Sequence, residues 1–230
     1  MAITLTNLTG NVSSTTASSY TTASISPGAN KLILASVYSR IATGTSNDPS
    51  LSGNGITWVK INSVAGGLGT NRRVWIYRGL VASPSAGAVT IDFGGQDQTN
   101  CIWSITEVDG IDTSGTNGSG AIVQSQTNTG SATSLTITLN ALASANNVAF
   151  GAISHQASQS VTPGDGFTEI DELRITSGST NTLQTEYKLN ETAVSASWTL
   201  SKECGGVALE LKMVSATGGF MTTNRGFWGA

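Results

Sequence analysis

One histidine, His155, is the only side chain in this sequence whose ordinary pKa would let it act as a general base near neutral pH. A Ser-His-Asp arrangement would have to use it, yet the G-x-S-x-G motif that presents a nucleophilic serine is absent. The nearest string, NGSG at residues 117–120, lies in a glycine-rich stretch. A zinc site built on several histidines is excluded by the same count. We therefore predict that the chain is not an enzyme and has no catalytic residues, and we interpret His155 as a structural or surface residue.

Paired carboxylates are the other catalytic option, because a glycosidase needs two acids at a suitable separation across a cleft. The candidates are spread over several strand-like runs: Asp92, Glu107, Glu169, Asp171, Glu186 and Glu210. Asp92, Glu186 and Glu210 occupy polar positions of alternating strands, where a solvated side chain is the usual outcome. Glu107 differs because it shares a face with the apolar residues Trp103 and Ile105. We predict a structural role for Glu107, at the sheet rim or beside a partner such as Arg78.

Residue spacing gives little support to metal or cofactor sites. Asp109 and Asp112 could offer oxygen ligands to calcium, but the string VDGIDTSG lacks the repeated acidic spacing of a calcium loop. Cys101 and Cys204 have no metal-ligand spacing, and two cysteines are too few for a disulfide framework. We predict free, packed thiols, while a pair in one sheet stays open. The glycine motifs that bind nucleotides are also absent, so we predict no cofactor.

Composition excludes several classes of partner. Charged residues make up 11% of the 230-residue chain and the formal net charge is −3, so no clustered basic surface is available to bind nucleic acid. No apolar run is long enough to span a bilayer, and the string MAITLTNLTG lacks the basic and apolar regions of a secretory signal peptide. We therefore expect synthesis in a cytoplasm, with neither nucleic acid nor membrane as a partner.

Alternation of apolar and polar residues indicates the fold. In AVTIDF, the residues Val89, Ile91 and Phe93 fall on one face, and SLTITLN, AVSASWTL and GVALELKM repeat the pattern. No helix-period segment of useful length occurs, and roughly ten to fourteen strands would be too many for one flat sheet. We predict an all-β fold, an antiparallel two-sheet β-sandwich or jelly roll formed by residues 1–214 as a single domain, with a C-terminal extended arm at 215–230.

Turn-forming residues suggest how the strands connect. The string GITWVKINSVAG is predicted to pair with RRVWIYRGLV across the glycine-rich break at residues 66–69. A second hairpin is predicted to join TLQTEYKL to AVSASWTL through residues 190–193. The stretch DTSGTNGSG, residues 112–120, is predicted to be an exposed loop.

Aromatic residues within strands offer a route to ligand binding. Because Val74, Ile76 and Leu80 already supply a core face, Trp75 and Tyr77 are predicted to line the opposite face of their strand. That face is either a second packing layer, an oligomer contact or a ligand platform on which a sugar ring could stack. Trp198 lies in the cleanest alternation of the chain and is predicted to be a core residue.

The last sixteen residues, SATGGFMTTNRGFWGA, combine several glycines with large apolar side chains. Disordered tails are normally poor in aromatic residues, so this composition suggests burial against another protein. We predict that the segment docks on a neighbouring subunit or on another protein, because buried aromatic residues and arginine dominate interface energies. The predicted partner-binding residues are Phe220, Met221, Arg225, Phe227 and Trp228.

The strings GNGITWVKINSV, RRVWIYRGLVASPSAGAVTIDFGG, CIWSITEVDGID and GGVALELK together resemble β-sandwich modules of bacteriophage virion structural proteins. The resemblance covers residues 30–214 and rests on strand patterns. It implies a capsid decoration or cement protein, a head fibre or a tail component at the virion surface. A homo-oligomer that binds another virion protein, such as a capsid subunit, would follow. The alternative that stays open is a carbohydrate-binding module or lectin-like adhesin with a glycan as its ligand.

Overall fold

Antiparallel strands form most of the regular structure in the computed structural model, which describes residues 3–65 and 70–214. The prediction of an all-β sandwich is therefore confirmed. One short 3-10 helix, η2 (Thr116–Ala121), lies where an exposed loop was predicted, and it buries Gly118 and Ala121. No helix within these ranges is long and apolar enough to cross a membrane. The strands are β1 (Thr4–Ser13), β2 (Ser19–Thr21), β3 (Leu32–Arg40), β4 (Ser50–Ser52), β5 (Val59–Val64), β6 (Arg72–Gly79), β7 (Thr90–Asp92), β8 (Asn100–Asp109), β9 (Ile122–Thr138), β10 (Val148–His155), β11 (Thr162–Pro163), β12 (Thr168–Ile175), β13 (Asn181–Leu189) and β14 (Ala193–Leu211).

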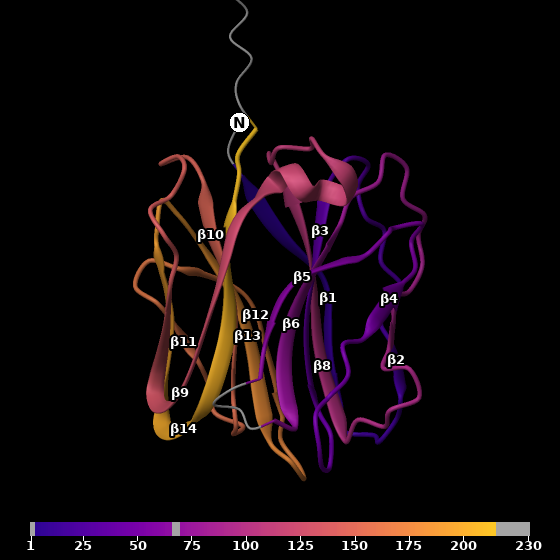
Figure 1. Ribbon diagram of the computed structural model, residues 1–230, viewed down its shortest axis with the longest axis vertical. Helices are drawn as coiled ribbons and strands as arrows, with labels where there is room; N and C mark the ends of the chain where they lie inside the picture. Colours follow the sequence, from indigo (N-terminus) through magenta and orange to yellow (C-terminus); the bar gives the residue numbers. More distant parts are fainter. Residues whose placement is uncertain (1–2, 66–69, 215–230) are drawn as a thin grey trace, which may run out of the picture.

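The strands are arranged in layers that lie side by side in Figure 1. One large sheet has the order β1-β8-β3-β6-β5, and the small sheet β2-β7-β4 covers its outer face. The other large sheet places β12, β13, β10, β14 and β9 in that order. The pairing of β9 with β14 shifts register between Ser197 and Lys202. On the other side of this bend, residues 134–138 of β9 pair with residues 193–197 of β14, which also pair with β11. These three segments form a layer that covers the outer face of the second large sheet.

Three apolar clusters fill the spaces between these layers, because most strands alternate core-facing and outward-facing side chains. The central cluster lies between the two large sheets and includes Tyr38, Ile76, Phe150 and Leu209. Each large sheet has a second cluster on its outer face. These outer clusters include Trp75, Tyr77, Ile91, Phe93 and Trp103 in the first half of the chain, and Leu135, Ile137, Ile153, Val194 and Trp198 in the second.

The two halves of the chain follow the same path. The first half comprises β1 to β8, and the second comprises β9 to β14, with β9 and β14 each counted as two strands at the bend. We number the eight strands of each half in chain order. In both halves, the large sheet then has the order 1-8-3-6-5 and the outer layer has the order 2-7-4. A bulge in β5 between Lys60 and Asn62 recurs in β12 between Glu169 and Asp171. The jelly-roll winding stays a prediction, which this order favours.

The connections confirm one predicted hairpin and contradict the other. β5 pairs with β6, as predicted. By contrast, β13 pairs with β10 and β12, whereas residues 193–197 of β14 pair with β9 and β11. Residues 190–192 therefore carry the chain from the inner sheet to the outer layer, which periodicity alone does not distinguish from a hairpin. Leu189 and Leu200, the last apolar residues of TLQTEYKL and AVSASWTL, are 57% and 60% exposed.

Candidate functional site

The end of β14 is fastened to the body at one pole of the molecule, where the polypeptide continues toward residue 215. The amide of Lys212 donates to Ala121 O (2.8 Å), and Asp112 N donates to Lys212 O (2.9 Å). Farther along, Val214 N donates to Gly110 O (3.0 Å). These bonds tie residues 212–214 to the segment that connects the two halves. The pole therefore provides a fixed departure point for the residues that follow.

A buried carboxylate, that of Glu210, accepts several hydrogen bonds next to this pole. Glu210 is fully buried, and its Oε1 accepts hydrogen bonds from Asn147 Nδ2 (2.6 Å) and from Ala143 N (2.7 Å). Its Oε2 accepts from Gln124 Nε2 (2.7 Å). Because a buried carboxylate needs several donors, this cluster fixes the loop before β10 against β9 and β14. Asn147 extends the network, since its Oδ1 accepts from Met213 N (3.2 Å).

An ion pair between Lys212 and Asp112 (2.8 Å) also joins the end of β14 to the segment that connects the two halves. Hydrogen bonds from Lys212 and from Ser114 lower the pKa of Asp112 to about 2. Asp109 is similarly paired with Lys31, which holds the pKa of its carboxyl below the ordinary range. The two carboxylates considered as calcium ligands are thus engaged by lysines. Within residues 3–65 and 70–214, no cluster of His, Cys, Asp and Glu could hold a metal ion.

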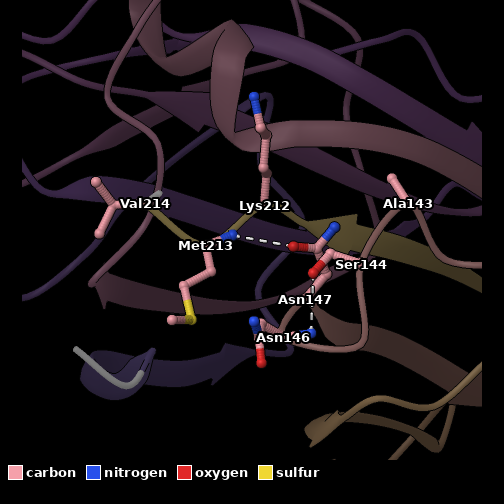
Figure 2. Close-up of a pocket in the computed structure, with 7 residues that line it drawn as sticks. All are labelled: Ala143, Ser144, Asn146, Asn147, Lys212, Met213 and Val214. Atoms are coloured by element: carbon pink, nitrogen blue, oxygen red, sulfur yellow. Dashed lines mark hydrogen bonds between the residues drawn. The ribbon is translucent and has the colours of Figure 1, made fainter. Parts of the chain in front are cut away.

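A recess of about 220 Å³ lies beside the last described residues. Figure 2 shows Asn147 and Met213 joined by a hydrogen bond at this recess, with Lys212 and Val214 on either side of Met213. Ala143, Ser144 and Asn146 complete the lining. The lining combines neutral polar groups with one lysine and contains no nucleophile paired with a base.

The five predicted partner-binding residues, Phe220, Met221, Arg225, Phe227 and Trp228, lie outside the described residues. The proposed ligand or oligomer face at Trp75 and Tyr77 needs correction. Trp75 is fully buried and Tyr77 is 4% exposed, because the small sheet β2-β7-β4 covers them. Of the three uses expected for this face, the structure shows the second packing layer.

The other residues considered for chemistry have packing roles. His155 is fully buried and stacks on Trp198 at 4.7 Å between ring centroids. Glu107 lies near the end of the inner strand β8 and accepts a hydrogen bond from Gly28 N (2.6 Å), so its partner is this backbone amide. Cys101 and Cys204 are free, buried thiols in different sheets.

Glu186 was expected to be solvated but is fully buried on β13. Its Oε2 accepts hydrogen bonds from Gln184 Nε2 (3.2 Å) and Gly164 N (3.3 Å). Burial raises the pKa of Glu186 to about 7. Such a value would suit a general acid, but Glu186 does not line either of the two recesses described for this structure.

A second recess of about 330 Å³ lies on the outer layer of the second half. Its lining is rich in hydroxyl groups, from Ser134, Thr136, Thr162, Ser195 and Ser197, and also includes Asp165. Sequence reasoning missed both recesses, because each is formed by loops and strands that are far apart in the chain. Comparisons of this chain with family models, curated proteins and solved structures found no match.

Proposed function

We propose that this protein is a non-enzymatic structural component of a virion surface, most specifically a capsid decoration or cement protein, which acts through protein–protein association. Residues 215–230 would form the attaching segment, with Phe227 and Trp228 as its apolar anchors. The virion setting rests on the resemblance of the strand patterns to phage structural proteins. The association role rests on the fixed pole described above.

The observation that carries the proposal is the anchoring of residues 212–214. Their backbone is held by Gly110, Ala121 and Asp112, and the side chain of Asn147 holds Met213. A segment that begins at a fixed point loses less conformational entropy when it binds a partner than a segment that begins at a frayed chain end. The pole is therefore a suitable base for an attaching segment rich in aromatic residues.

Removal of residues 215–230 tests this role. We expect the truncated chain to melt within a few degrees of the full chain, because the sheets of residues 3–214 pack three apolar clusters against one another. Attachment to native particles, followed by imaging or co-sedimentation, should be lost. The double substitution Phe227→Ala and Trp228→Ala should reproduce the loss, whereas Thr222→Ala with Thr223→Ala should not. Unchanged attachment of the truncated chain would contradict the proposal.

Glycan binding is the second candidate function, and the hydroxyl-lined recess favours it. Hydroxyl groups and the Asp165 carboxylate can exchange hydrogen bonds with a sugar. However, the aromatic residues that first suggested this function, Trp75 and Tyr77, are buried. A glycan array with the full chain, compared with Ser195→Val, would test it. Binding that the substitution abolishes would favour this second function.

A further inference from the structure

The outer edge of β9 is an unpaired strand edge in one of the large sheets. Residues Gln124–Ala132 pair with Glu210–Lys202 of β14 without a break in register. Within the described part of the chain, β9 pairs with no strand other than β14. Within the described residues, its outward backbone groups bond no further strand, which leaves room for one more strand at this edge.

Other sheet edges carry features that discourage pairing with another chain. β12 contains a bulge at Ile170 and four charged residues, Glu169, Asp171, Glu172 and Arg174. β5 contains a bulge at Ile61 and the charged residue Lys60. β2, β4 and β11 are only two or three residues long. Bulges, charges and short length are the usual protections of an edge strand.

β1, the counterpart of β9 in the first half, is also partly protected. A register shift between Asn7 and Thr9 divides its pairing with β8 into two short segments. β9 has no such interruption between Gln124 and Ala132, and the string QSQTNTGSA contains neither a charged residue nor proline. Among the described edges, this segment is the longest without a register shift, a charged residue or a proline.

The contacts of this segment mostly involve side chains, and one backbone amide, Thr129 N, donates to Asn128 Oδ1 (2.8 Å). From the first half, Asn62 Nδ2 donates to Ser125 Oγ (3.0 Å), a contact between side chains. Asn128 Nδ2 donates to Thr136 O (2.7 Å), so its side chain binds the bent part of β9. These contacts fix the segment against β5 and against the bent part of β9.

We infer that the Gln124–Ala132 edge of β9 pairs with the same edge of a second copy of this chain, in an antiparallel arrangement about a two-fold axis. The inference deepens the proposed association function and rests on it. Such a contact is self-complementary, as a two-fold interface requires. It joins two large sheets into one continuous sheet through backbone hydrogen bonds.

The chemistry of the segment fits a copy of itself better than a charged partner. An antiparallel self-pair places neutral hydroxyl and amide side chains opposite one another, and pairs of Thr and Ser are favourable across strands. The β12 edge paired with itself would instead bring carboxylates together. A net charge of −3 over 230 residues adds little long-range repulsion between copies.

A lysine on the edge tests the inference in the full-length chain. Thr127 is exposed on β9, and Thr127→Lys would place two positive charges close together at the two-fold contact. Thr6 is exposed on β1, so Thr6→Lys is the matched control. Light scattering coupled to size exclusion should show a dimer for the wild type and Thr6→Lys. Thr127→Lys should be a monomer, with its dissociation constant raised at least tenfold.

Folding is checked by the melting temperature, and Thr129→Lys provides a second variant should Thr127→Lys not fold. A wild-type chain that is monomeric up to 100 µM overturns the inference, as does a Thr127→Lys or Thr129→Lys dimer of undiminished affinity. Equal weakening by Thr6→Lys also overturns it. Removal of residues 215–230 should leave the dimer intact. A dimer that depends on those residues and not on Thr127 overturns the β9 contact while supporting the attaching segment.

Discussion

The two halves of the molecule use the same strand positions to hold loops of their outer layers, but with opposite hydrogen-bonding roles. In the first half, Trp75 Nε1 donates to Asp48 Oδ1 (2.7 Å) and the Tyr77 hydroxyl donates to Pro49 O (2.5 Å). Neutral side chains on β6 thus donate to a loop that supplies acceptors. The carboxylate at this junction, Asp48, lies on the loop.

Asp48 is well compensated. Burial alone would raise its pKa, but hydrogen bonds from Lys60 and Trp75 outweigh burial and hold the pKa below its ordinary value. The charge of Arg73 acts in the same direction. The first half therefore keeps its loop in place across the neutral pH range.

In the second half, the residues at the same positions on β13 are Gln184 and Glu186. Here a carboxylate on the strand accepts a hydrogen bond from the loop amide of Gly164. Within the described residues, no ion pair joins Glu186 to a lysine or arginine, and its partner across the strands is another acid, Glu169. Equal topology therefore does not imply equal electrostatics, and the second half should respond to pH where the first does not.

Loss of the largest aromatic side chain in the second outer core should have the greatest effect. Trp198 is 6% exposed, stacks on His155 and donates from Nε1 to Ala132 O (3.0 Å). We expect Trp198→Ala to lower the free energy of unfolding by about 3–5 kcal/mol. Chemical denaturation measures this directly. Its counterpart Phe93→Ala should cost a similar amount, and a melting shift near zero for Trp198→Ala would show that this outer layer is not a core.

The pH response of Glu186 provides the next largest effect. Its pKa in the folded state, about 7, lies above the ordinary 4.5, so the folded state binds more protons between these values. The contribution of Glu186 to the free energy of unfolding is fully present below about pH 4.5, and it is lost as the pH rises to about 7. The loss amounts to about 3 kcal/mol.

The charged group that acts on Glu186 is Glu169 on β12, which lies opposite it and raises its pKa further. Glu186→Gln keeps the shape of the side chain but removes its titration. We expect this variant to lose much of the decline in stability between pH 5 and pH 8, measured by denaturant unfolding at each pH. Tyr77→Phe is the matched control and should leave the decline unchanged. A Glu186→Gln variant with the wild-type pH profile would contradict the prediction.

His155 should change the stability of the folded state by a comparable amount, but its contribution should be lost as the pH falls. Burial lowers the pKa of His155 to about 4, below the ordinary 6.5, so the unfolded chain binds more protons between these values. Stability from this group is present above about pH 6.5 and is lost as the pH falls to about 4, by about 3 kcal/mol. The first half has the neutral Ser39 at this position, bonded to Gln98.

His155→Asn should therefore flatten the acid side of the stability profile. Any packing loss from the weaker stacking on Trp198 would lower the whole curve and leave its slope unchanged. Ser39→Ala in the first half should shift the curve without altering its pH dependence. An unchanged acid slope in His155→Asn would assign the acid sensitivity to other groups.

Period-two patterns made most of the strands predictable, because a strand with one buried face must alternate. The same patterns placed Trp75 and Tyr77 on the face opposite Val74, as observed. They did not reveal what covers that face. β2, β4 and β7 each contain three residues, too few to carry a periodic signal. The small sheet β2-β7-β4, which buries the face of Trp75 and Tyr77, could therefore not be predicted from the sequence.

The repetition of the fold did leave a readable signal. GNGIT at residues 53–57 corresponds to GDGFT at 164–168, and ANKL at 29–32 corresponds to ANNV at 145–148. Each pair precedes equivalent strands, β5 and β12 or β3 and β10. The Glu210 cluster could not be predicted in this way. A glutamate at a polar position of a strand appears solvated until a loop distant in sequence covers it, as residues 143–147 do here.

The smallest expected effect concerns the bend that lets β14 belong to two layers. In the first half, β7 and β8 are separate strands joined by a turn that contains Gly94 and Gly95. In the second half, Leu200 occupies the bend and is 60% exposed, although its place in AVSASWTL suggested a core position. Exposed side chains contribute little to stability. We expect Leu200→Ser to change the free energy of unfolding by no more than about 0.5 kcal/mol in denaturant unfolding, whereas Val194→Ser, in the buried part of the same strand, should cost several times as much. A large loss for Leu200→Ser would mean that the bend is buried, and that the second half does not separate its two layers at the place where the first half does.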